Sequence, residues 1–171
     1  MNTPKIIGLC GPKQVGKSTY AKTFDDAIIL SFAAPIKKML EVILPHPGWL
    51  NRKDEPIPDF LDGVTARHLL QTLGTEWGRE SIHPNIWVEV ALKEARKHIG
   101  KRTIVFDDIR FPNEAWAIRR LGHVHEVISE IIHLDRKGYI QESDDHVSEA
   151  GLPKHFIDTW ITLDGEKEKP H

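Results

Sequence analysis

The stretch GPKQVGKS, residues 11–18, places a lysine and a serine directly after the second of two glycines. Its spacing, G-x-x-x-x-G-K-[ST], is the P-loop pattern. The glycines let the backbone curl until successive N–H groups point at phosphate oxygens, and a following helix adds its N–H donors and positive dipole end. Lys17 can bridge the β- and γ-phosphates, and the hydroxyl of Ser18 can ligate Mg²⁺. The sequence therefore predicts a binding site for a nucleoside triphosphate.

Every position of this stretch except the proline is a predicted nucleotide-binding residue, and so is the threonine that follows it. The set is Gly11, Lys13, Gln14, Val15, Gly16, Lys17, Ser18 and Thr19. Lys13 and Gln14 lie inside the loop although the pattern does not specify them, and Thr19 supports the site from the next helical position. The alternative is a glycine-rich turn that binds nothing. The strand expected before the loop and the helix expected after it favour the phosphate site.

Two carboxylates follow TIVF, at the carboxyl end of an expected core strand: Asp107 and Asp108. A carboxylate at that place suits a metal shell or a contact with an acceptor. Ser18, Asp107 and Asp108 are therefore predicted ligands of Mg²⁺. Asp108 is preferred, because Arg110 follows it two residues later in DIRF. The alternative is that one aspartate caps the helix expected over 112–122 while the other is solvated.

The segment 66–79 reads as an amphipathic helix that Thr65 caps. At 100° per residue, its predicted core side is Ala66, Leu69, Leu70, Leu73 and Trp77, and its polar side is Arg67, Gln71, Gly74, Thr75 and Gly78. Glycines on a polar helix face cost about 1 kcal/mol each relative to alanine, so they favour close approach of a ligand. A base or sugar along this face, with Arg67 on a phosphate and Gln71 on a base edge, is one interpretation. An ordinary surface helix is the other.

The pattern leaves three nearby features open. Arg79 lies to one side of the polar face and can swing in near the helix end. Trp87 either packs in the core or forms a wall of a base pocket. The segment NRKD, 51–54, departs from the guanine-reading pattern N-K-x-D because its lysine is displaced by one position, so we interpret it as a solvated loop.

The elements that position these residues alternate between strands and helices. Strands are expected over 5–11, 27–33, 102–108, 127–134 and 159–163, and helices over 17–24, 35–44, 66–79, 84–99 and 112–122, the last ending in a glycine. The stretch 45–63 reads as an irregular excursion, and 135–152 as a polar loop leading into a short helix. This alternation predicts an α/β fold with a mostly parallel sheet, in which ligands bind beyond the carboxyl ends of the strands.

Composition limits the remaining possibilities. With 171 residues, 40% hydrophobic and 28% charged, the chain reads as a single globular domain, 1–171. A net charge of −2 provides no general attraction for a nucleic acid polymer, and no apolar run approaches the ~18 residues of a membrane span. The single cysteine and the absence of a signal-peptide pattern predict a cytoplasmic protein.

Six segments occur in an order that resembles a known family: GPKQVGKST, FAAPIKKML, RHLLQTLGTEWGRE, IWV, FDDIRFPNEA and DDHVSEAGLP. Together they resemble the deoxynucleoside monophosphate (dNMP) kinases of bacteriophages, a branch of the P-loop nucleoside monophosphate kinase fold, over roughly residues 5–153. The resemblance implies a P-loop NTPase-type three-layer fold and transfer of the γ-phosphate of ATP to a dNMP with Mg²⁺, giving dNDP and ADP. It also implies the host cytoplasm as the location, if the chain is phage-encoded.

The resemblance also implies residue roles within a single kinase domain. Residues 35–99 would form the helical acceptor-binding region, and residues from about 135 to 150 a short lid. The implied catalytic residues are Lys17, Asp108, Arg110 and Arg136, with Arg136 reaching the phosphates from the lid. The predicted acceptor-binding residues are Arg67, Gln71, Gly74, Thr75, Arg79 and Trp87.

Two other functions stay open at this point. A P-loop kinase for another small acceptor, such as dephospho-coenzyme A, would share the loop and strand order, and a non-catalytic protein would bind ATP without transferring phosphate. The expected partners are the small molecules ATP and dNMP, and a homodimer is a further alternative.

Overall fold

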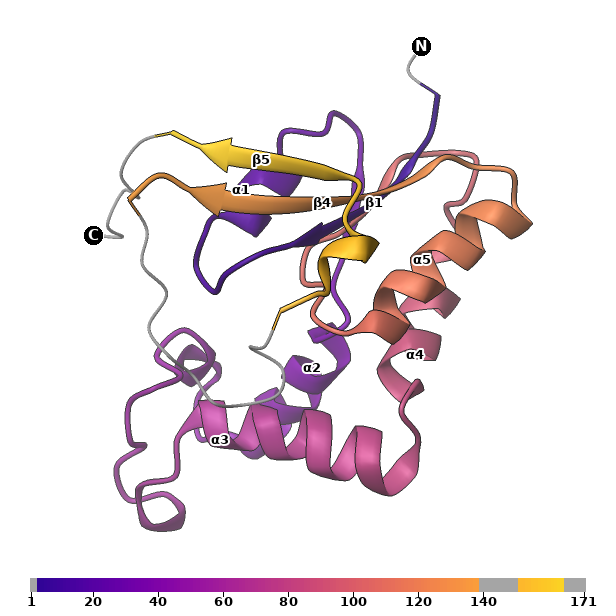
Figure 1. Ribbon diagram of the computed structural model, residues 1–171. Coiled ribbons are helices and arrows are strands. Elements are labelled where there is room, and N and C mark those ends of the chain that lie inside the picture. Colours follow the sequence, from indigo (N-terminus) through magenta and orange to yellow (C-terminus); the bar gives the residue numbers. More distant parts are fainter. Residues whose placement is uncertain (1–2, 139–150, 165–171) are drawn as a thin grey trace. The chain divides into compact units, whose positions relative to one another are not determined.

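A computed structural model describes residues 3–138 and 151–164 (Figure 1). The chain divides into two compact units, one formed by Met1–Ser31 with Ala91–His171 and the other by Phe32–Val90. Most of the predicted lid, residues 139–150, lies outside the described residues. No helix in the described part of the chain is long and apolar enough to span a membrane.

The first unit is built on a five-stranded sheet. Its strands are β1 (Ile6–Cys10), β2 (Ile28–Leu30), β3 (Ile104–Phe106), β4 (Ser129–Arg136) and β5 (Thr159–Leu163). They lie in the order β2-β3-β1-β4-β5, and every neighbouring pair is parallel. The predicted α/β class is confirmed, and the described sheet is parallel throughout. From β1 the chain adds β2 and β3 on one side of the sheet and then β4 and β5 on the other, so the strand order reverses at β1. Folds of this kind bind ligands at the carboxyl end of the strand where the order reverses.

The apolar run of β1 is explained by burial on both faces. All five of its residues are buried, as expected for a central parallel strand. On one face Ile7 and Leu9 share a core cluster with Ala21 of α1 (Lys17–Ala21). On the other face Gly8 lies so close to the chain after β3 that a Cβ there would be 2.1 Å from Cδ1 of Ile109.

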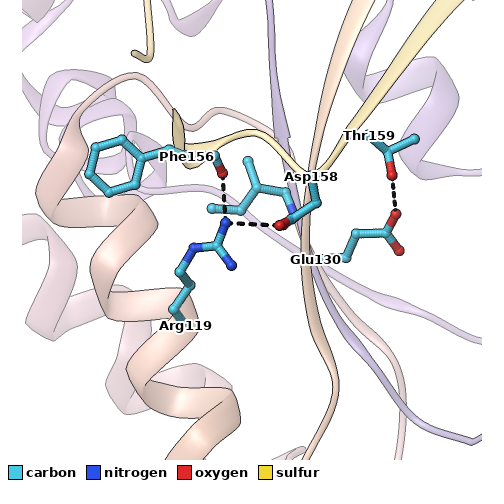
Figure 2. A network of polar contacts seen from close by, with 6 residues as sticks. Arg119, Glu130, Phe156, Asp158 and Thr159 are labelled. Carbon is cyan, nitrogen blue, oxygen red and sulfur yellow. Dashed lines mark hydrogen bonds and ion pairs between the residues drawn. The ribbon is translucent and has the colours of Figure 1, made fainter. Parts of the chain in front are cut away.

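The helix α5 (Pro112–Val124) and the edge strand β5 are joined by polar contacts (Figure 2). Arg119 of α5 donates to the carbonyl oxygen of Phe156 at 2.9 Å and to Oδ1 of Asp158 at 3.0 Å. The hydroxyl of Thr159 donates to Oε1 of Glu130 on β4 at 2.6 Å. These contacts hold the start of β5 in place, which fixes its register against β4.

Gly122 does not end α5, contrary to the prediction that this helix stops at its glycine. The helix continues to Val124, and Gly122 is buried within it. A Cβ on Gly122 would lie 2.7 Å from the carbonyl oxygen of Val127. The glycine therefore permits close approach of the following chain, and a left-handed cap is not its role.

The second unit is helical. It contains α2 (Ala34–Ile43), two short turns η1 (Pro47–Leu50) and η2 (Leu61–Gly63), α3 (Ala66–Gln71) and η3 (Thr72–Ile82), while α4 (Ile86–Ala95) contributes residues to both units. Leu40, Leu44, Ile57 and Ala66 form its buried core. Thr65 caps α3 as predicted, because its hydroxyl accepts a hydrogen bond from the N–H of His68 at 3.1 Å.

The predicted helix 66–79 changes its winding at Thr72. From there to Ile82 it is a π-helix, in which each N–H bonds five residues back instead of four. The assumed 100° per residue therefore fails beyond Gln71. Gly74 and Gly78 are buried instead of lying on an open polar face, and Trp77, predicted as core, is 42% exposed.

The close approach to these two glycines is made by Trp87 of α4. Its indole N–H donates to the carbonyl oxygen of Gly74 at 2.7 Å, and its side chain is 3% exposed. A Cβ on Gly78 would lie 2.5 Å from Cζ2 of this ring. Of the two roles left open for Trp87, the structure shows the packing role.

Replacing Gly78 by alanine should destabilise the fold. The ring of Trp87 cannot move away without losing its hydrogen bond to Gly74, so overpacking should lower the free energy of unfolding by about 2 kcal/mol. Gly74→Ala is the matched comparison, because its nearest obstacle is the flexible end of Ile36 at 3.1 Å. Urea unfolding followed by tryptophan fluorescence measures both variants. Equal destabilisation by the two substitutions would contradict the packing argument.

Candidate nucleotide-binding site

The loop after β1 has the backbone that the glycine pattern predicts. Gly11 has a φ of 127° and Gly16 a φ of 112°, both in the region that favours glycine. A Cβ on Gly11 would also lie 2.1 Å from the carbonyl oxygen of Leu134. Gly16 is the residue before α1, so the loop leads directly into the first helical N–H groups. Side chains at these two positions would distort the loop.

Lys17 lies close to the beginning of the loop. Its ammonium group donates to the carbonyl oxygens of Gly11 at 2.8 Å and Pro12 at 2.7 Å. The helix α1 has only five residues and ends at Ala21, short of the predicted residue 24. Because so short a helix adds little dipole, the loop N–H groups and the charge of Lys17 provide most of the attraction for an anion.

Two of the other predicted loop residues differ in exposure. Val15 is fully buried in the core cluster below the loop, so only its backbone can contact a ligand. Thr19 is exposed on α1. Lys13 and Gln14 lie in the loop itself, and Gln14 has a positive φ of 64°. This strained conformation shows that the loop curls at its middle as well as at its glycines.

The structure brings Ser18 and Asp107 together. Their side chains come from α1 and from the residue after β3, and the hydroxyl of Ser18 donates to Oδ2 of Asp107 at 2.7 Å. Asp108 instead accepts a hydrogen bond from the hydroxyl of Ser31 at 2.6 Å. The geometry therefore favours Asp107 as the carboxylate of a metal shell, whereas the sequence pattern favoured Asp108.

The pair formed by Ser18 and Asp107 fits Mg²⁺. Both provide hard oxygen donors, and Mg²⁺ in phosphoryl-transfer sites takes one or two protein ligands while phosphate oxygens and waters complete its shell. Among residues 3–138 and 151–164 there is no group of three or more His, Cys, Asp or Glu side chains arranged to hold a metal. A site with few protein ligands is the kind that these residues can form.

Glu114 and Ser31 were missed by the sequence analysis. Glu114 is 1% exposed, and its Oε2 accepts hydrogen bonds from the N–H groups of Arg110 at 2.8 Å and Phe111 at 3.1 Å. Glu114 therefore caps the N–H of Phe111 at the start of α5. The sequence analysis had considered only Asp107 and Asp108 for capping this helix. Its position three residues after Phe111 is the signal that could have identified it.

Arg136, which the predicted lid would include, is the last residue of β4. Its Nε donates to the carbonyl oxygen of Val15 at 3.1 Å, and its Nη2 would lie 2.9 Å from a Cβ built on Gly16. Arg136 thus reaches the loop 11–18 from the strand beside β1. The lid itself stays a prediction.

The predicted acceptor residues lie in the helical unit. Arg67 forms an ion pair with Asp54, Gln71 is partly exposed at the end of α3, and Arg79 donates to the carbonyl oxygen of Pro84 at 3.2 Å. The other three are the buried Gly74, Thr75 and Trp87. Of the three polar candidates that suit an acceptor phosphate or base, Arg67 and Gln71 lie on α3, before the winding changes, and Arg79 lies on η3.

Cys10, at the end of β1, should react slowly with thiol reagents. Burial raises the pKa of its thiol to about 11, an effect that the nearby Lys17 only partly offsets. Only about one molecule in a thousand then carries the thiolate at pH 8, and labelling by a disulfide reagent should be about 100-fold slower than in urea. Stability should fall as pH rises from about 9 towards 11, because the unfolded thiol ionises first. Rapid labelling of the folded protein at pH 8 would contradict this.

Comparisons with known proteins identify the family of the chain. The model of the family "Deoxynucleotide monophosphate kinase" matches residues 50–169. A protein of Acanthamoeba polyphaga mimivirus, described as "Putative deoxynucleotide monophosphate kinase", is 34% identical over 165 residues, covering 86% of this chain and 81% of that protein. A crystal structure of a "putative kinase" from Chloroflexus aurantiacus has a TM-score of 0.53 at 15% identity, covers 96% of this chain and 86% of its own, and supports the fold alone.

The phage relatives are longer than the part that this chain matches. The deoxynucleoside-5′-monophosphate kinase of Escherichia phage T5 is 31% identical over 96 residues, 55% of this chain and 37% of that protein. The deoxynucleotide monophosphate kinase of Enterobacteria phage T4 is 31% identical over 121 residues, 70% of this chain and 47% of that protein. Because the family model matches residues 50–169, well over half of this chain, the chain belongs to the deoxynucleotide monophosphate kinase family.

Proposed function

We propose that the chain transfers the γ-phosphate of ATP to a deoxynucleoside monophosphate, giving dNDP and ADP. The observation that carries the proposal is the contact between Ser18 and Asp107 beside a loop of P-loop spacing, in a chain of this family. The loop supports the donor side of the reaction, and the names of the relatives support the acceptor.

The donor triphosphate is assigned to the loop 11–18. Its N–H groups and the ammonium of Lys17 neutralise phosphate oxygens, and Lys17 exchanges its two loop carbonyls for the β- and γ-phosphates. Arg136 holds the loop through Val15 and adds positive charge beside Gly16. Ser18 and Asp107 would hold Mg²⁺, which when bound stabilises the negative charge that develops on the transferred group.

The acceptor is assigned to Arg67, Gln71 and Arg79, with Arg67 on its phosphate. Asp108 and Arg110 are assigned to the transferring phosphate: Glu114 fixes the backbone of Arg110, and Ser31 fixes the carboxylate of Asp108. A carboxylate held in this way costs little reorganisation when charge develops, and the fixed backbone places the origin of the Arg110 side chain. Transfer is direct, without a covalent enzyme intermediate, and closure of the site excludes water, which would otherwise accept the phosphate.

One coupled assay tests the proposal. ADP formation is measured with ATP, Mg²⁺ and each of the four dNMPs, and then with the ribonucleotides and dephospho-coenzyme A. The expected result is turnover with at least one dNMP and none with dephospho-coenzyme A. Turnover only with dephospho-coenzyme A, or ATP binding without transfer to any acceptor, would overturn the proposal.

A further inference from the structure

The segment NRKD (51–54) carries a contact that the proposed function leaves unassigned. Asp54 holds the guanidinium of Arg67 by two hydrogen bonds, from Nε to Oδ1 and from Nη2 to Oδ2, the second at 3.1 Å. The side chain of Arg67 is 20% exposed and that of Asp54 is 62% exposed. The guanidinium assigned to the acceptor phosphate is therefore fixed in one orientation by a carboxylate that reaches it from the excursion before α3.

The backbone already ties this segment to the start of α3. The N–H of Arg67 donates to the carbonyl oxygen of Lys53 at 2.9 Å, and the N–H of Ile57 donates to the carbonyl oxygen of Val64 at 3.2 Å. Pro56 and Thr65 form an antiparallel bridge between these two contacts. These backbone contacts do not involve the carboxylate of Asp54, so removing that carboxylate leaves the attachment of residues 53–57 in place.

The chemistry of the guanidinium suits a shared contact. Its planar group has donors along two edges, and each edge can bind a pair of oxygens. Asp54 binds the edge formed by Nε and Nη2, and a phosphate is assigned to the edge formed by Nη1 and Nη2. An arginine held in this way loses less side-chain entropy when a phosphate binds. Since Asp54 is mostly exposed, water screens its repulsion of that phosphate.

We propose that Asp54 is a positioning residue that orients Arg67 towards the phosphate of the acceptor. In this role it acts through Arg67 and needs no contact of its own with either substrate. This role rests on the proposed function, because it assumes that Arg67 binds the acceptor.

Steady-state kinetics of Asp54→Ala test this role. The KM for the dNMP should rise about fivefold, as expected for loss of a partly exposed ion pair, while the KM for ATP and kcat stay at their wild-type values. Asp54→Asn keeps a single acceptor oxygen and should give an intermediate KM. Glu55→Ala is the matched control: Glu55 is the next residue and pairs with Arg52 at 2.9 Å, so its loss should leave both KM values unchanged.

A double-mutant cycle separates positioning from a general structural effect. Arg67→Ala should raise the KM for the dNMP far more than that for ATP, and Asp54→Ala in that background should add nothing. A wild-type KM in Asp54→Ala, or additive effects in the double variant, overturns the role of Asp54 and leaves the proposed function intact. A wild-type protein that transfers phosphate to no dNMP overturns both.

Discussion

Lys17→Ala is expected to lower kcat for phosphate transfer by about 10³-fold. The ammonium lies at the beginning of the loop, where it contacts the carbonyl oxygens of Gly11 and Pro12, and the β- and γ-phosphates are assigned to this place. Its removal withdraws a full positive charge from the group that gains negative charge in the transition state, a loss comparable to that of a main oxyanion donor. The coupled assay with ATP and the best dNMP measures it.

The control for this variant is Lys22→Ala. Lys22 is exposed and follows the last residue of α1, so the substitution removes the same charge from the same segment without touching the loop. It should keep wild-type kcat, and both variants should unfold at the same urea concentration. Normal turnover by Lys17→Ala would reject the assignment of the loop as the donor site.

The sequence predicted the first strand and the backbone of the loop after it well because their signals are local. The apolar run of β1 and the two glycines with positive φ depend only on neighbouring residues, and a spacing pattern records them directly. The meeting of Ser18 and Asp107 follows from one further rule, that parallel strands end at the same edge of a sheet.

The capping role of Glu114 had a local signal that was overlooked, whereas other missed features depend on pairing between distant segments or on the winding of a helix. Ser31 reaches Asp108 because β2 lies beside β3, a neighbour relation that no local pattern specifies. The buried position of Gly74 and Gly78 depends on the π-winding that begins at Thr72, whereas helical propensity and the 3.6-residue period assume ordinary α-helical bonding. The ring of Trp87 from α4 fills the space beside Gly78 and donates to the carbonyl oxygen of Gly74, and the side chain of Ile36 lies beside Gly74.

The different roles proposed for the two aspartates rest on their different hydroxyl partners. Asp107 shares its carboxylate with Ser18, the residue that the loop pattern assigns to the metal, whereas Asp108 is held by Ser31 at the end of β2. Adjacent residues after a strand point in different directions, so the two carboxylates cannot serve the same position. One is therefore suited to the donor and the other to the transferring group.

Asp107→Asn is expected to raise the Mg²⁺ concentration for half-maximal activity at least tenfold and to lower kcat/KM for ATP about 100-fold. The amide keeps the shape and can still accept the hydrogen bond of Ser18, but it loses the negative charge that a hard cation prefers in its shell. Asp108→Asn should lower kcat while the Mg²⁺ requirement stays unchanged, because Asp108 is assigned to the transferring phosphate. Titration of Mg²⁺ at saturating ATP measures kcat and the Mg²⁺ requirement of both variants, and initial rates at varied ATP measure kcat/KM.

Asp25→Asn provides the matched control, since Asp25 is exposed in the same unit and the substitution removes one carboxylate charge. Its Mg²⁺ titration should follow that of the wild type. Calorimetry provides an independent measurement, in which ATP binds in the presence of Mg²⁺ and without an acceptor. This binding should weaken in Asp107→Asn and not in Asp108→Asn. If Asp108→Asn instead shifted the Mg²⁺ titration and Asp107→Asn did not, the hydroxyl partners would have assigned the two carboxylates the wrong way round, and the preference drawn from the sequence alone would be restored.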